Sequence, residues 1–574
     1  MALPVELDVA VRGWLAEDPD PDTRAELQSL LDAGDSAELT DAFTGRLQFG
    51  TAGLRGKLGP GPNRMNRAVV RRAAAGLGRF LLDTDPEAAA RGVVIGYDAR
   101  HKSDAFADDT AAVMAGLGIR AYLMPHVVPT PVLAFAIRQL GCAAGVMVTA
   151  SHNPPADNGY KVYLGDGAQI VPPADEVISA AIDAVGPLSG VRLAALDDDL
   201  IARLGDEPIA AYVDAAAGLA RTPSARDLSI AYTPLHGVGR DVLLRVFARA
   251  GFAAPRLVAE QSDPDPTFQT VAFPNPEEPG ALDLVIAEAS AMGADLVVAN
   301  DPDADRLSVA IPDEAAPGGW RPLRGDEIGA LFADHLLAQT SGDDRLVVTT
   351  IVSSTLLSKM AAAAGVQYAE TLTGFKWIVR AAIDRPGTTM VLGYEEALGF
   401  SIGDVVRDKD GIGAALVFAE LAATSKAAGV PLTRRLDDIA RRFGVHATEQ
   451  WSSWLEGADG QERIRSVMAG LRASLPETIA GRAVTAVDDL AAGIRREGGS
   501  ESKLDLPPSD VITLHMAGAR VVVRPSGTEP KLKMYFEVAV PVDEGDDALA
   551  AAREQAAGDL AALKAELAQL TGLS

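Results

Sequence analysis

The sequence predicts an α/β protein of several domains, whose last domain is instead built on an antiparallel sheet. The chain has 574 residues, and domains of roughly 100–200 residues would divide it into about three to five. Over most of its length, short β-branched runs alternate with Ala- and Leu-rich segments of helical period. Near the C-terminus this alternation gives way to consecutive strand patterns separated by turn residues.

Six short apolar runs are predicted to be buried strands: Val93–Tyr97, Ala144–Thr149, Leu228–Tyr232, Asp295–Ala299, Leu346–Ile351 and Thr389–Gly393. Six longer segments are predicted to be helices that cover the sheets: Asp104–Leu117, Asp241–Gly251, Gly280–Met292, Asp326–Ala338, Ser354–Ala364 and Ala414–Ala428. Because the two kinds of segment alternate along the chain, we expect several parallel βαβ units.

The C-terminal region is predicted to be an antiparallel meander closed by a helix. Its strands are expected at Val511–Met516, Ala519–Val523 and Leu532–Val538, and its helix at Asp547–Leu570. The segment Arg496–Asp510 combines charged residues with Gly and Pro, and is predicted to be an exposed loop.

The charge of the chain argues against polyanionic partners. Asp and Glu total 79 against 52 Lys and Arg, which gives a formal net charge of −27. Such a field repels nucleic acid and anionic membranes. A small phosphorylated substrate would also be repelled at long range, so its site must gather basic side chains and backbone donors locally.

Cysteine content and the absence of targeting patterns predict a cytoplasmic protein. Cys142 is the only cysteine, so neither an internal disulfide nor a cysteine-rich metal site is expected. The sequence shows no basic leader and no uncharged apolar run of about 18 residues, so we expect no signal peptide and no membrane span. No long heptad is visible, and the oligomeric state stays open.

The segment 149–154 (TASHNP) places Ser151 just past a predicted buried strand, where open α/β sheets commonly bind ligands. Ser151 is therefore a candidate nucleophile. The same residues are also common turn formers, and this motif alone leaves both interpretations open. A serine hydrolase is disfavoured, because Thr149 and Asn153 do not form the Gly-x-Ser-x-Gly elbow.

Three carboxylates follow another predicted strand within five residues: Asp301, Asp303 and Asp305. Carboxylate oxygens suit Mg²⁺, which keeps positions open for water or phosphate. An EF-hand is excluded, because its sixth position would be Arg306 rather than Gly and its twelfth Pro312 rather than Glu. A cation site is favoured over an acidic solvated loop, since three adjacent carboxylates repel one another without a cation.

Two further segments carry residues suited to a phosphorylated sugar. The segment 524–530 (RPSGTEP) offers a guanidinium, two hydroxyls and free amides for a phosphate, although a plain hairpin turn fits equally well. The segment 393–400 (GYEEALGF) places two carboxylates between glycines, where they could accept hydrogen bonds from sugar hydroxyls. Its alternative interpretation is an acidic helix N-terminus.

Two segments resemble nucleotide-binding motifs, but neither matches the full pattern. The segment 50–58 differs from a Walker A loop, because it has five residues between its glycines and no Ser or Thr after Lys57. The segment 236–240 is only part of a dinucleotide fingerprint, because Val242 stands where the third Gly belongs.

Taken together and in this order, the four motifs resemble the α-D-phosphohexomutase superfamily. Its members carry a Thr-Ala-Ser-His-Asn-Pro phosphoserine loop, an Asp-x-Asp-x-Asp-Arg metal loop, a Gly-x-Glu-x sugar loop and an Arg-x-Ser-Gly-Thr phosphate loop. The resemblance covers nearly the whole chain, and its further segments are 50–56 (GTAGLRG), 96–100 (GYDAR), 158–161 (NGYK) and 372–376 (LTGFK). The sugar loop looks most like the phosphoglucomutase/phosphopentomutase branch.

The resemblance implies four domains around a central cleft. Three are α/β domains with mixed sheets, and the C-terminal one is an α+β domain with an antiparallel sheet. The implied ranges are 1–220 with the phosphoserine loop, 221–320 with the metal loop, 321–445 with the sugar loop and 446–574 with the phosphate loop.

The resemblance also implies roles for individual residues. Catalytic roles fall to Ser151, His152, Lys161 and Arg55, with His152 or Lys161 as the proton shuttle. Mg²⁺ would be held by Ser151, as a phosphoserine, together with Asp301, Asp303 and Asp305. The substrate would contact Arg306, Gly374, Lys376, Glu395, Ala397, Arg524, Ser526, Gly527, Thr528 and Lys531.

The implied activity is a phosphosugar mutase that interconverts sugar 1-phosphate and 6-phosphate through a sugar 1,6-bisphosphate. Glucose is the expected sugar, with mannose, a pentose 1-/5-phosphate or an amino sugar as alternatives. Ala397 stands where many hexose enzymes have Ser, and Phe400 where bacterial mannose/glucose enzymes have His, so the sugar stays open. A sugar bisphosphate synthase and a non-catalytic sugar-phosphate sensor are the alternative functions.

Overall fold

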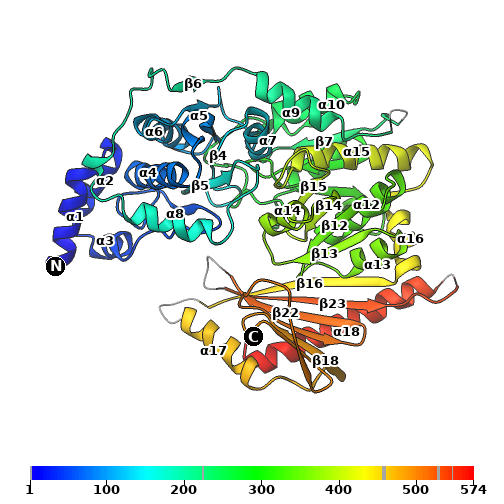
Figure 1. The fold of residues 1–574 in the computed structure, drawn as a ribbon. Coiled ribbons are helices and arrows are strands. Elements are labelled where there is room, and N and C mark those ends of the chain that lie inside the picture. The colour runs from blue at the N-terminus through cyan, green and yellow to red at the C-terminus, as the bar shows by residue number, and fades with distance from the viewer. Residues whose placement is uncertain (1–2, 223–224, 456–459, 527–530, 546, 574) are drawn as a thin grey trace. The chain divides into compact units, whose positions relative to one another are not determined.

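The computed structural model describes residues 3–222, 225–455, 460–526, 531–545 and 547–573 (Figure 1). The chain forms two compact units, and each is described by itself. The first unit contains Met1–Leu323 and Leu398–Ala428, and the second contains Arg324–Ala397 and Gly429–Ser574.

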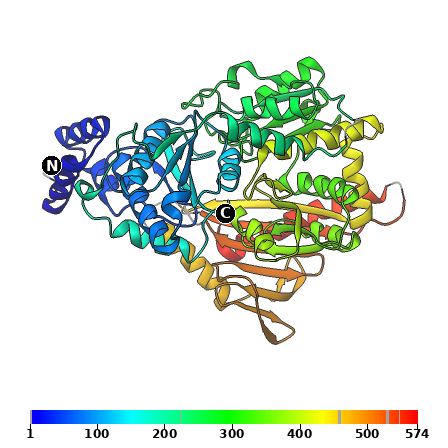
Figure 2. The ribbon, with the colours of Figure 1, turned by 45° about the horizontal axis from the view of Figure 1, so that its top comes forward.

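The first unit begins with three helices that the sequence analysis did not predict: α1 (Val5–Glu17), α2 (Pro21–Ala33) and α3 (Ser36–Phe43). Asp20 and Asp35 cap the second and third by accepting a hydrogen bond from a backbone N–H of the first turn. Val11, Leu27 and Leu39 form a small core between the helices. Figure 2 shows this dark blue group beside the α/β layers that follow it.

The first sheet is mixed, as expected. Its strands, in the order β1-β5-β4-β2-β3-β6, are Leu54–Lys57, Asp157–Leu164, Ala144–Val148, Val93–Tyr97, Ala121–Leu123 and Ile201–Arg203. The last four run parallel, whereas β5 and β1 are antiparallel to their neighbours. The helices of this region are α4 (Arg67–Thr84), α5 (Ala88–Arg91), α6 (Ser103–Gly116), α7 (Thr130–Leu140), α8 (Ala174–Asp183) and α9 (Glu207–Ala217). Every residue of β4 is buried, which suits a strand covered on both faces.

The second sheet is also mixed. Its strands, in the order β11-β10-β9-β7-β8, are Trp320–Pro322, Ser308–Pro312, Leu296–Ala299, Ile230–Thr233 and Arg256–Leu257. Strands β9, β7 and β8 are parallel, and β10 and β11 complete the sheet in antiparallel fashion. Its helices are α10 (Arg240–Arg249) and α11 (Asp283–Met292). The first unit also contains β15 (Gly399–Ile402) and α15 (Gly411–Ala427).

The second unit starts with a parallel α/β layer. Strand β12 (Arg345–Thr350) pairs in parallel with β13 (Gln367–Thr371) on one side and β14 (Thr389–Glu395) on the other. The helices of this part are α12 (Gly325–Gln339), α13 (Leu356–Ala363), α14 (Phe375–Ile383) and α16 (Leu432–Phe443).

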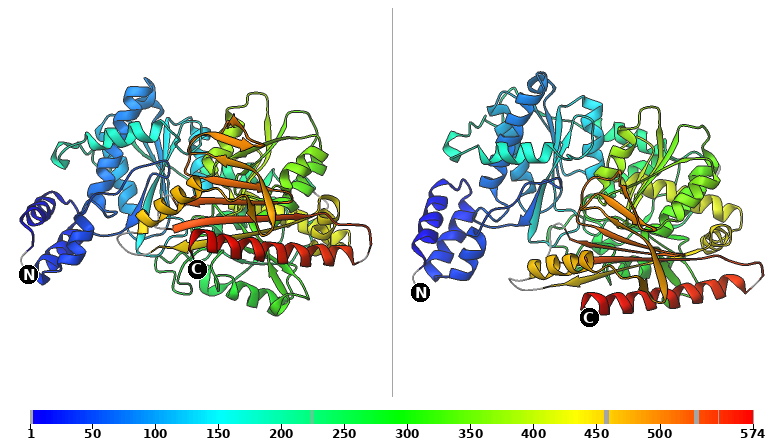
Figure 3. Two further views of the ribbon diagram at one scale, coloured as in Figure 1. Left: turned by 90° about the horizontal axis from the view of Figure 1, so that it is seen from below. Right: turned by 60° about the horizontal axis from the view of Figure 1, so that its bottom comes forward.

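An antiparallel sheet completes the second unit. Its strands, in the order β16-β23-β22-β21-β18-β19-β20, are Val445–Trp454, Lys531–Val540, Ala519–Pro525, Ile512–Met516, Arg482–Asp489, Ile494–Glu497 and Ser500–Lys503, and β17 (Thr478–Ile479) pairs with β18. Helix α17 (Gly460–Ala473) and the long α18 (Ala548–Thr571) complete this part. Both views of Figure 3 show α18 lying along the sheet, where it contacts β16 and β23.

The predicted fold class is confirmed, and one local prediction is wrong. The meander and the last helix lie where they were expected. The segment Arg496–Asp510, predicted to be an exposed loop, instead contributes to the hairpin of β19 and β20. Gly498 and Gly499 both have positive φ angles of 57° and 80°, which is the backbone of a tight hairpin turn. The predicted division into four domains stays a prediction.

No single described helix is long and apolar enough to span a membrane; only α15 and α16 taken together pass on length and composition.

Candidate active site

Ser151 lies in a tight turn directly after β4. It is 3% exposed, and its φ of +53° is in the left-handed region that a residue with a side chain rarely adopts. Its backbone N–H donates to Thr149 Oγ1 at 2.8 Å, which fixes the turn. Its hydroxyl donates to Asp301 Oδ2 at 2.7 Å and lies 3.1 Å from His152 Nδ1. The turn therefore presents the hydroxyl to the aspartate loop.

The guanidinium of Arg100 stabilises the serine turn through hydrogen bonds to its backbone carbonyl oxygens. One terminal nitrogen donates to the carbonyl oxygens of Ser151 and Asn153, both at 2.6 Å. The other donates to the carbonyl oxygens of Pro154 at 2.8 Å and Asp157 at 3.0 Å. One buried side chain thus satisfies four backbone acceptors of the turn, and we assign it a positioning role rather than contact with a ligand.

Replacing Arg100 with Met is expected to lower the free energy of unfolding by about 3–5 kcal/mol, because it removes a buried charge-assisted network and leaves its acceptors unpaired. Urea unfolding of the full chain measures this. Arg203→Met is the matched control, because the Arg203 side chain is 55% exposed and its ion pair, among the described residues, is with Asp108 at 3.2 Å. An Arg100→Met loss no larger than that of the control would contradict the positioning role.

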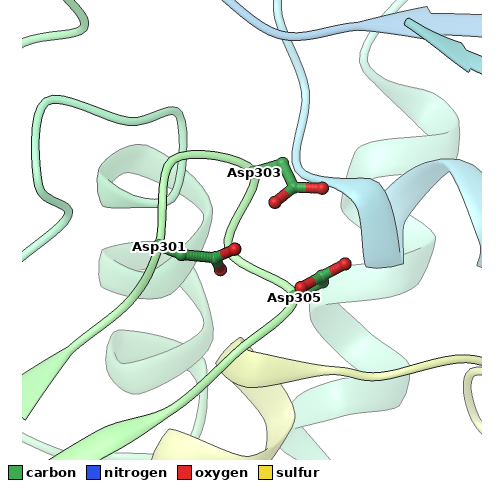
Figure 4. A group of neighbouring side chains, drawn as sticks. All are labelled: Asp301, Asp303 and Asp305. Carbon is green, nitrogen blue, oxygen red and sulfur yellow. The ribbon is translucent and has the colours of Figure 1, made fainter. Parts of the chain in front are cut away.

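The three predicted aspartates lie in the loop between β9 and β10. All three are fully buried, and Figure 4 shows their side chains turned toward a common space. One carboxylate oxygen from each lies within 4.8 Å of the others. Ala304 between them has a φ of +54°, so this loop also carries backbone strain. Gly411 packs against the loop so tightly that a Cβ there would lie 2.2 Å from the carbonyl oxygen of Arg306.

Cations of the first unit compensate part of this negative charge. Lys161 Nζ donates to Asp303 Oδ2 at 2.7 Å and to Asp305 Oδ2 at 2.9 Å, and Lys409 Nζ lies 3.4 Å from Asp305 Oδ2. Burial opposes the charge on Lys161, but the two carboxylates outweigh burial and raise its pKa. Thr130 also donates a hydroxyl hydrogen bond of 2.6 Å to Asp303.

The donor set fits a hard divalent cation. Burial and the other two carboxylates raise the pKa of Asp301 well above its ordinary value, so the loop disfavours three negative charges without further compensation. Among the described residues, Asp303 Oδ1 and Asp305 Oδ1 are buried without a hydrogen-bond partner. Unpartnered carboxylate oxygens facing one space are the ligands that Mg²⁺ prefers.

The remaining predicted residues of the first unit surround the serine turn. Arg55 donates to Asn153 Oδ1 at 3.0 Å, and Arg306 donates to Glu277 Oε2 at 3.0 Å. Burial, together with the charges of Arg306 and Arg55, holds the pKa of His152 well below its ordinary value. His152 is therefore neutral at neutral pH.

The sugar loop of the second unit follows β14. Glu395 is the last residue of this strand and is 9% exposed, so the alternative interpretation as a helix N-terminus is wrong. Glu396 Oε2 accepts hydrogen bonds from Ser353 Oγ at 3.1 Å and Thr350 Oγ1 at 3.3 Å. Ala397 is the next residue of the same loop.

Gly374 and Lys376 lie where α14 begins. Gly374 precedes the helix with a φ of +107°, which favours glycine, and Lys376 is in its first turn. The basic side chain is thus carried by a helix of the same α/β layer as the sugar loop.

The predicted phosphate loop lies between β22 and β23. Arg524 is near the end of β22, Ser526 follows it, and the N–H of Ser526 donates to the carbonyl oxygen of Lys531 at 2.7 Å. Lys531 Nζ lies 4.4 Å from the centre of the Trp454 ring. Gly527 and Thr528 lie outside the described residues. Burial and then Glu396 raise the pKa of Tyr535, whereas Arg524 lowers it.

Glu396 predicts a pH-dependent stability. Burial, then Glu395 and Asp326, raise its pKa from 4.5 to about 7. The folded state favours the protonated carboxyl, so its contribution to stability is fully present below pH 4.5 and is lost as the pH rises to about 7.

Glu396→Gln is therefore expected to flatten the pH dependence and to raise the free energy of unfolding above about pH 7 by at most about 3 kcal/mol. Urea midpoints between about pH 5 and about pH 8 measure the difference from the unchanged protein. Glu477→Gln, the same change at an exposed position, is the control. Parallel pH profiles for the Glu396→Gln variant and the unchanged protein would refute the perturbed pKa.

The structure adds four residues to those assigned a site role from the sequence: Arg100, Thr130, Glu396 and Lys409. Arg100 and Glu396 lie inside the segments 96–100 and 393–400, but nothing in their spacing shows what they contact. Thr130 precedes a Pro at the start of a helix, and Lys409 follows an Asp. Both patterns are common in unrelated loops. Only the fold shows that they reach Asp303 and Asp305.

The chain matches family profiles, curated proteins and solved structures of one kind. Profiles of phosphoglucomutase/phosphomannomutase α/β/α domains I, II and III match residues 46–187, 210–314 and 324–443, and the profile of the C-terminal domain matches residues 476–556. Together these ranges cover most of the chain.

Curated relatives extend over nearly the full length. A protein of Haemophilus influenzae named "Probable phosphomannomutase" is 44% identical over 478 residues, which are 82% of this chain and 93% of that protein. A protein of Schizosaccharomyces pombe named "Probable phosphoribomutase" is 38% identical over 567 residues, 92% of this chain and 93% of that protein. The solved structure of a phosphoglucomutase (parafusin) from Paramecium matches with a TM-score of 0.65 and 19% identity, covering 93% of this chain and 97% of that one. The structural match shows a shared fold.

Proposed function

This chain belongs to the phosphoglucomutase/phosphomannomutase family, and we propose that it is a phosphosugar mutase whose phosphoryl carrier is Ser151. The observation that carries the proposal is the 2.7 Å hydrogen bond from Ser151 Oγ to Asp301. It joins a strained, buried serine turn to a loop of three carboxylates. A hydroxyl placed against a cation site is what phosphoryl transfer requires, because the transferring oxygens carry negative charge.

The reaction has two transfers that mirror each other. Phosphorylated Ser151 gives its phosphoryl group to the free hydroxyl of a sugar 1-phosphate; the bond from phosphorus to Ser151 Oγ breaks, a bond to the sugar oxygen forms, and the hydroxyl proton leaves to a base. The resulting sugar 1,6-bisphosphate turns around in the site. The oxygen of Ser151 meanwhile takes up the proton from the base. In the second transfer the bond from the other phosphorus to its sugar oxygen breaks, a bond to Ser151 Oγ forms, and the serine proton passes through the base to that sugar oxygen. The isomeric sugar phosphate and phosphorylated Ser151 result.

The residues of the first unit would bind and neutralise the transferring group. Asp301, Asp303 and Asp305, together with the phosphate on Ser151, would hold Mg²⁺. When bound, Mg²⁺ neutralises charge on the phosphoryl oxygens. Lys161, which its carboxylate partners keep charged, would neutralise the same group.

His152, Arg55 and Arg306 would complete the group of residues around the transferring phosphoryl group. His152 is the better candidate for the proton acceptor, because its ring lies 3.1 Å from Ser151 Oγ, whereas Lys161 is kept protonated by its two carboxylate partners. Arg55 and Arg306 would contribute positive charge around the transferring group.

The residues of the second unit would hold the rest of the substrate. Glu395 would accept hydrogen bonds from sugar hydroxyls, with Ala397 beside it. The phosphate that does not react would be bound by Arg524, Ser526, Gly527, Thr528 and Lys531. Gly374 and Lys376 would contact the substrate from the start of α14.

A side-by-side rate comparison tests the proposal and chooses the sugar. The purified chain with Mg²⁺ is expected to isomerise at least one of glucose, mannose, ribose and glucosamine phosphates, and a trace of the matching bisphosphate should raise the rate. Net accumulation of bisphosphate without isomerisation would instead indicate a bisphosphate synthase. Binding of all four sugars without turnover would refute the mutase.

A further inference from the structure

The second unit contains a cavity of about 620 Å³ that the proposed reaction does not use. This volume lies within the range of sites for small molecules, roughly 300–1,000 Å³. The cavity lies where α16 ends, where β21 turns into β22 and where β23 ends. Phe443, Val540, Pro541 and Val542 supply its apolar surface.

Four cations line this cavity: Lys359, Arg441, Arg442 and Arg482. They come from three separate elements, α13, α16 and β18, so the helix dipole of α16 accounts for at most two of them. No carboxylate is among the described residues that line it. In a chain with a net charge of −27, this is a local concentration of positive charge.

Neighbouring carboxylates neutralise three of the four cations. Arg441 pairs with Asp438 at 3.3 Å, Arg442 with Asp334 at 3.0 Å and Arg482 with Asp559 at 2.6 Å. These pairs orient the guanidinium groups, and each guanidinium has more N–H donors than one carboxylate occupies.

Lys359 differs from the three arginines. The Lys359 ammonium contacts the carbonyl oxygen of Phe443 at 3.4 Å and His446 Nε2 at 2.9 Å, neither of which carries negative charge. The lining therefore offers one cation without a paired carboxylate among these contacts, and several guanidinium donors. A phosphate group is the anion that best matches such a set.

The cavity is far from the predicted phosphate loop. The lining residue Val540 is at one end of β23, whereas Lys531 and the adjoining Ser526 are at the other. The strand is 10 residues long, which corresponds to roughly 30 Å. One phosphate group cannot contact both places.

A hydrogen-bonded chain leads from the cavity wall into the unit. Lys359 contacts His446 Nε2, and His446 Nδ1 lies 2.9 Å from Glu537 Oε1. The same Glu537 oxygen accepts from Ser354 Oγ at 2.8 Å and from the N–H of Thr355 at 2.7 Å. The loop after β12 is thereby tied to the cavity.

The loop after β12 also contacts the sugar loop. Arg520 bonds both Glu537 Oε2, at 3.2 Å, and the carbonyl oxygen of Ser353. Ser353 Oγ in turn donates to Glu396 Oε2 at 3.1 Å, and Glu396 adjoins Glu395. A phosphate that attracts the Lys359 ammonium would change its contact with His446, and the chain of contacts would pass this change to residues 351–355.

We propose that this cavity is a second, non-catalytic binding site for a phosphate-bearing metabolite, and that its occupancy is coupled through Lys359 and His446 to the loop of residues 351–355. The coupling to turnover rests on the proposed function, but the binding site does not.

Calorimetric titration of the full chain with inorganic pyrophosphate, in magnesium-free buffer without sugar, tests the binding. Arg524→Ala removes an arginine of the predicted phosphate loop, so binding that survives this change and then falls with a second change at a lining cation reports on the cavity. Adding Arg441→Gln or Lys359→Met is expected to weaken that binding at least tenfold. Arg465→Gln, a change of an exposed, ion-paired arginine on α17, should leave it unchanged. Loss of all binding in Arg524→Ala alone, or equal binding in all variants, would overturn the site.

Amide hydrogen exchange tests the coupling in the same Arg524→Ala protein. Pyrophosphate is expected to change exchange at residues 351–355, and Lys359→Met should abolish that change. Binding without any change at 351–355 would overturn the coupling. Because these experiments need no turnover, their failure leaves the mutase proposal untouched, and failure of the mutase assay leaves the site untouched.

Discussion

Replacing Ser151 with Ala is expected to lower mutase turnover by at least about 1,000-fold, because the phosphoryl carrier is lost and no other described hydroxyl bonds Asp301. Alanine keeps a Cβ, so the positive φ of the turn costs the variant as much as it costs the serine. The fold should therefore persist. Sugar-phosphate binding should remain measurable by calorimetry, since the groups proposed to bind the sugar and the second phosphate are unchanged.

The control for this variant is Ser290→Ala, which removes an exposed hydroxyl of α11 that donates to the carbonyl oxygen of Ile286 in the same helix. It should leave the rate within twofold of the unchanged protein, about 0.4 kcal/mol. Intact-mass measurement after incubation with a sugar bisphosphate should find one phosphoryl group on the unchanged protein and none on the Ser151→Ala variant. Full activity in that variant would refute the phosphoserine mechanism.

The sequence predicted the parts of the site that lie directly after strands. Ser151 follows β4 and Asp301 follows β9, and the ends of such strands were recognisable from their apolar runs. The pattern could not show that the two loops meet, because that contact joins residues 150 positions apart. The resemblance supplied this pairing, and the 2.7 Å contact within the first unit agrees with it.

Three other features of the structure could not be predicted from the sequence. The first three helices surround a small core whose fully buried side chains, among the described residues, are Val11, Leu27 and Leu39, so their apolar periodicity is weak. The hairpin of β19 and β20 is exposed and rich in charged residues. Because such a composition is typical of loops, its two strands were not predicted. The cations of the cavity are spread over residues 359–482, and only the packing of α13, α16 and β18 gathers them.

Removal of divalent metal is expected to stop turnover, with a loss of about 1,000-fold or more, since a bound cation contributes several kcal/mol to phosphoryl transfer. Lys161 already balances part of the charge through Asp303 and Asp305 but uses one oxygen of each. The other oxygen of each carboxylate stays buried without a hydrogen-bond partner among the described residues. Dialysis against a chelator and titration with Mg²⁺ measure the loss and its recovery. Unchanged rates after chelation would refute a metal-dependent reaction.

Measuring Mg²⁺ binding in the absence of substrate tests the metal site independently of the catalytic reaction. Mg²⁺ at about 100 times its dissociation constant should stabilise the folded chain by about 2.7 kcal/mol, which thermal unfolding detects without any substrate. Asp303→Asn keeps an oxygen that can accept from Lys161 and Thr130 but removes the charge, so it should lose both this stabilisation and turnover. Asp227→Asn, a change at a fully exposed carboxylate, should keep both. If the Asp303→Asn variant is stabilised by Mg²⁺ as strongly as the control, the three aspartates do not form the metal site, because a buried carboxylate that binds the ion cannot be neutralised without cost.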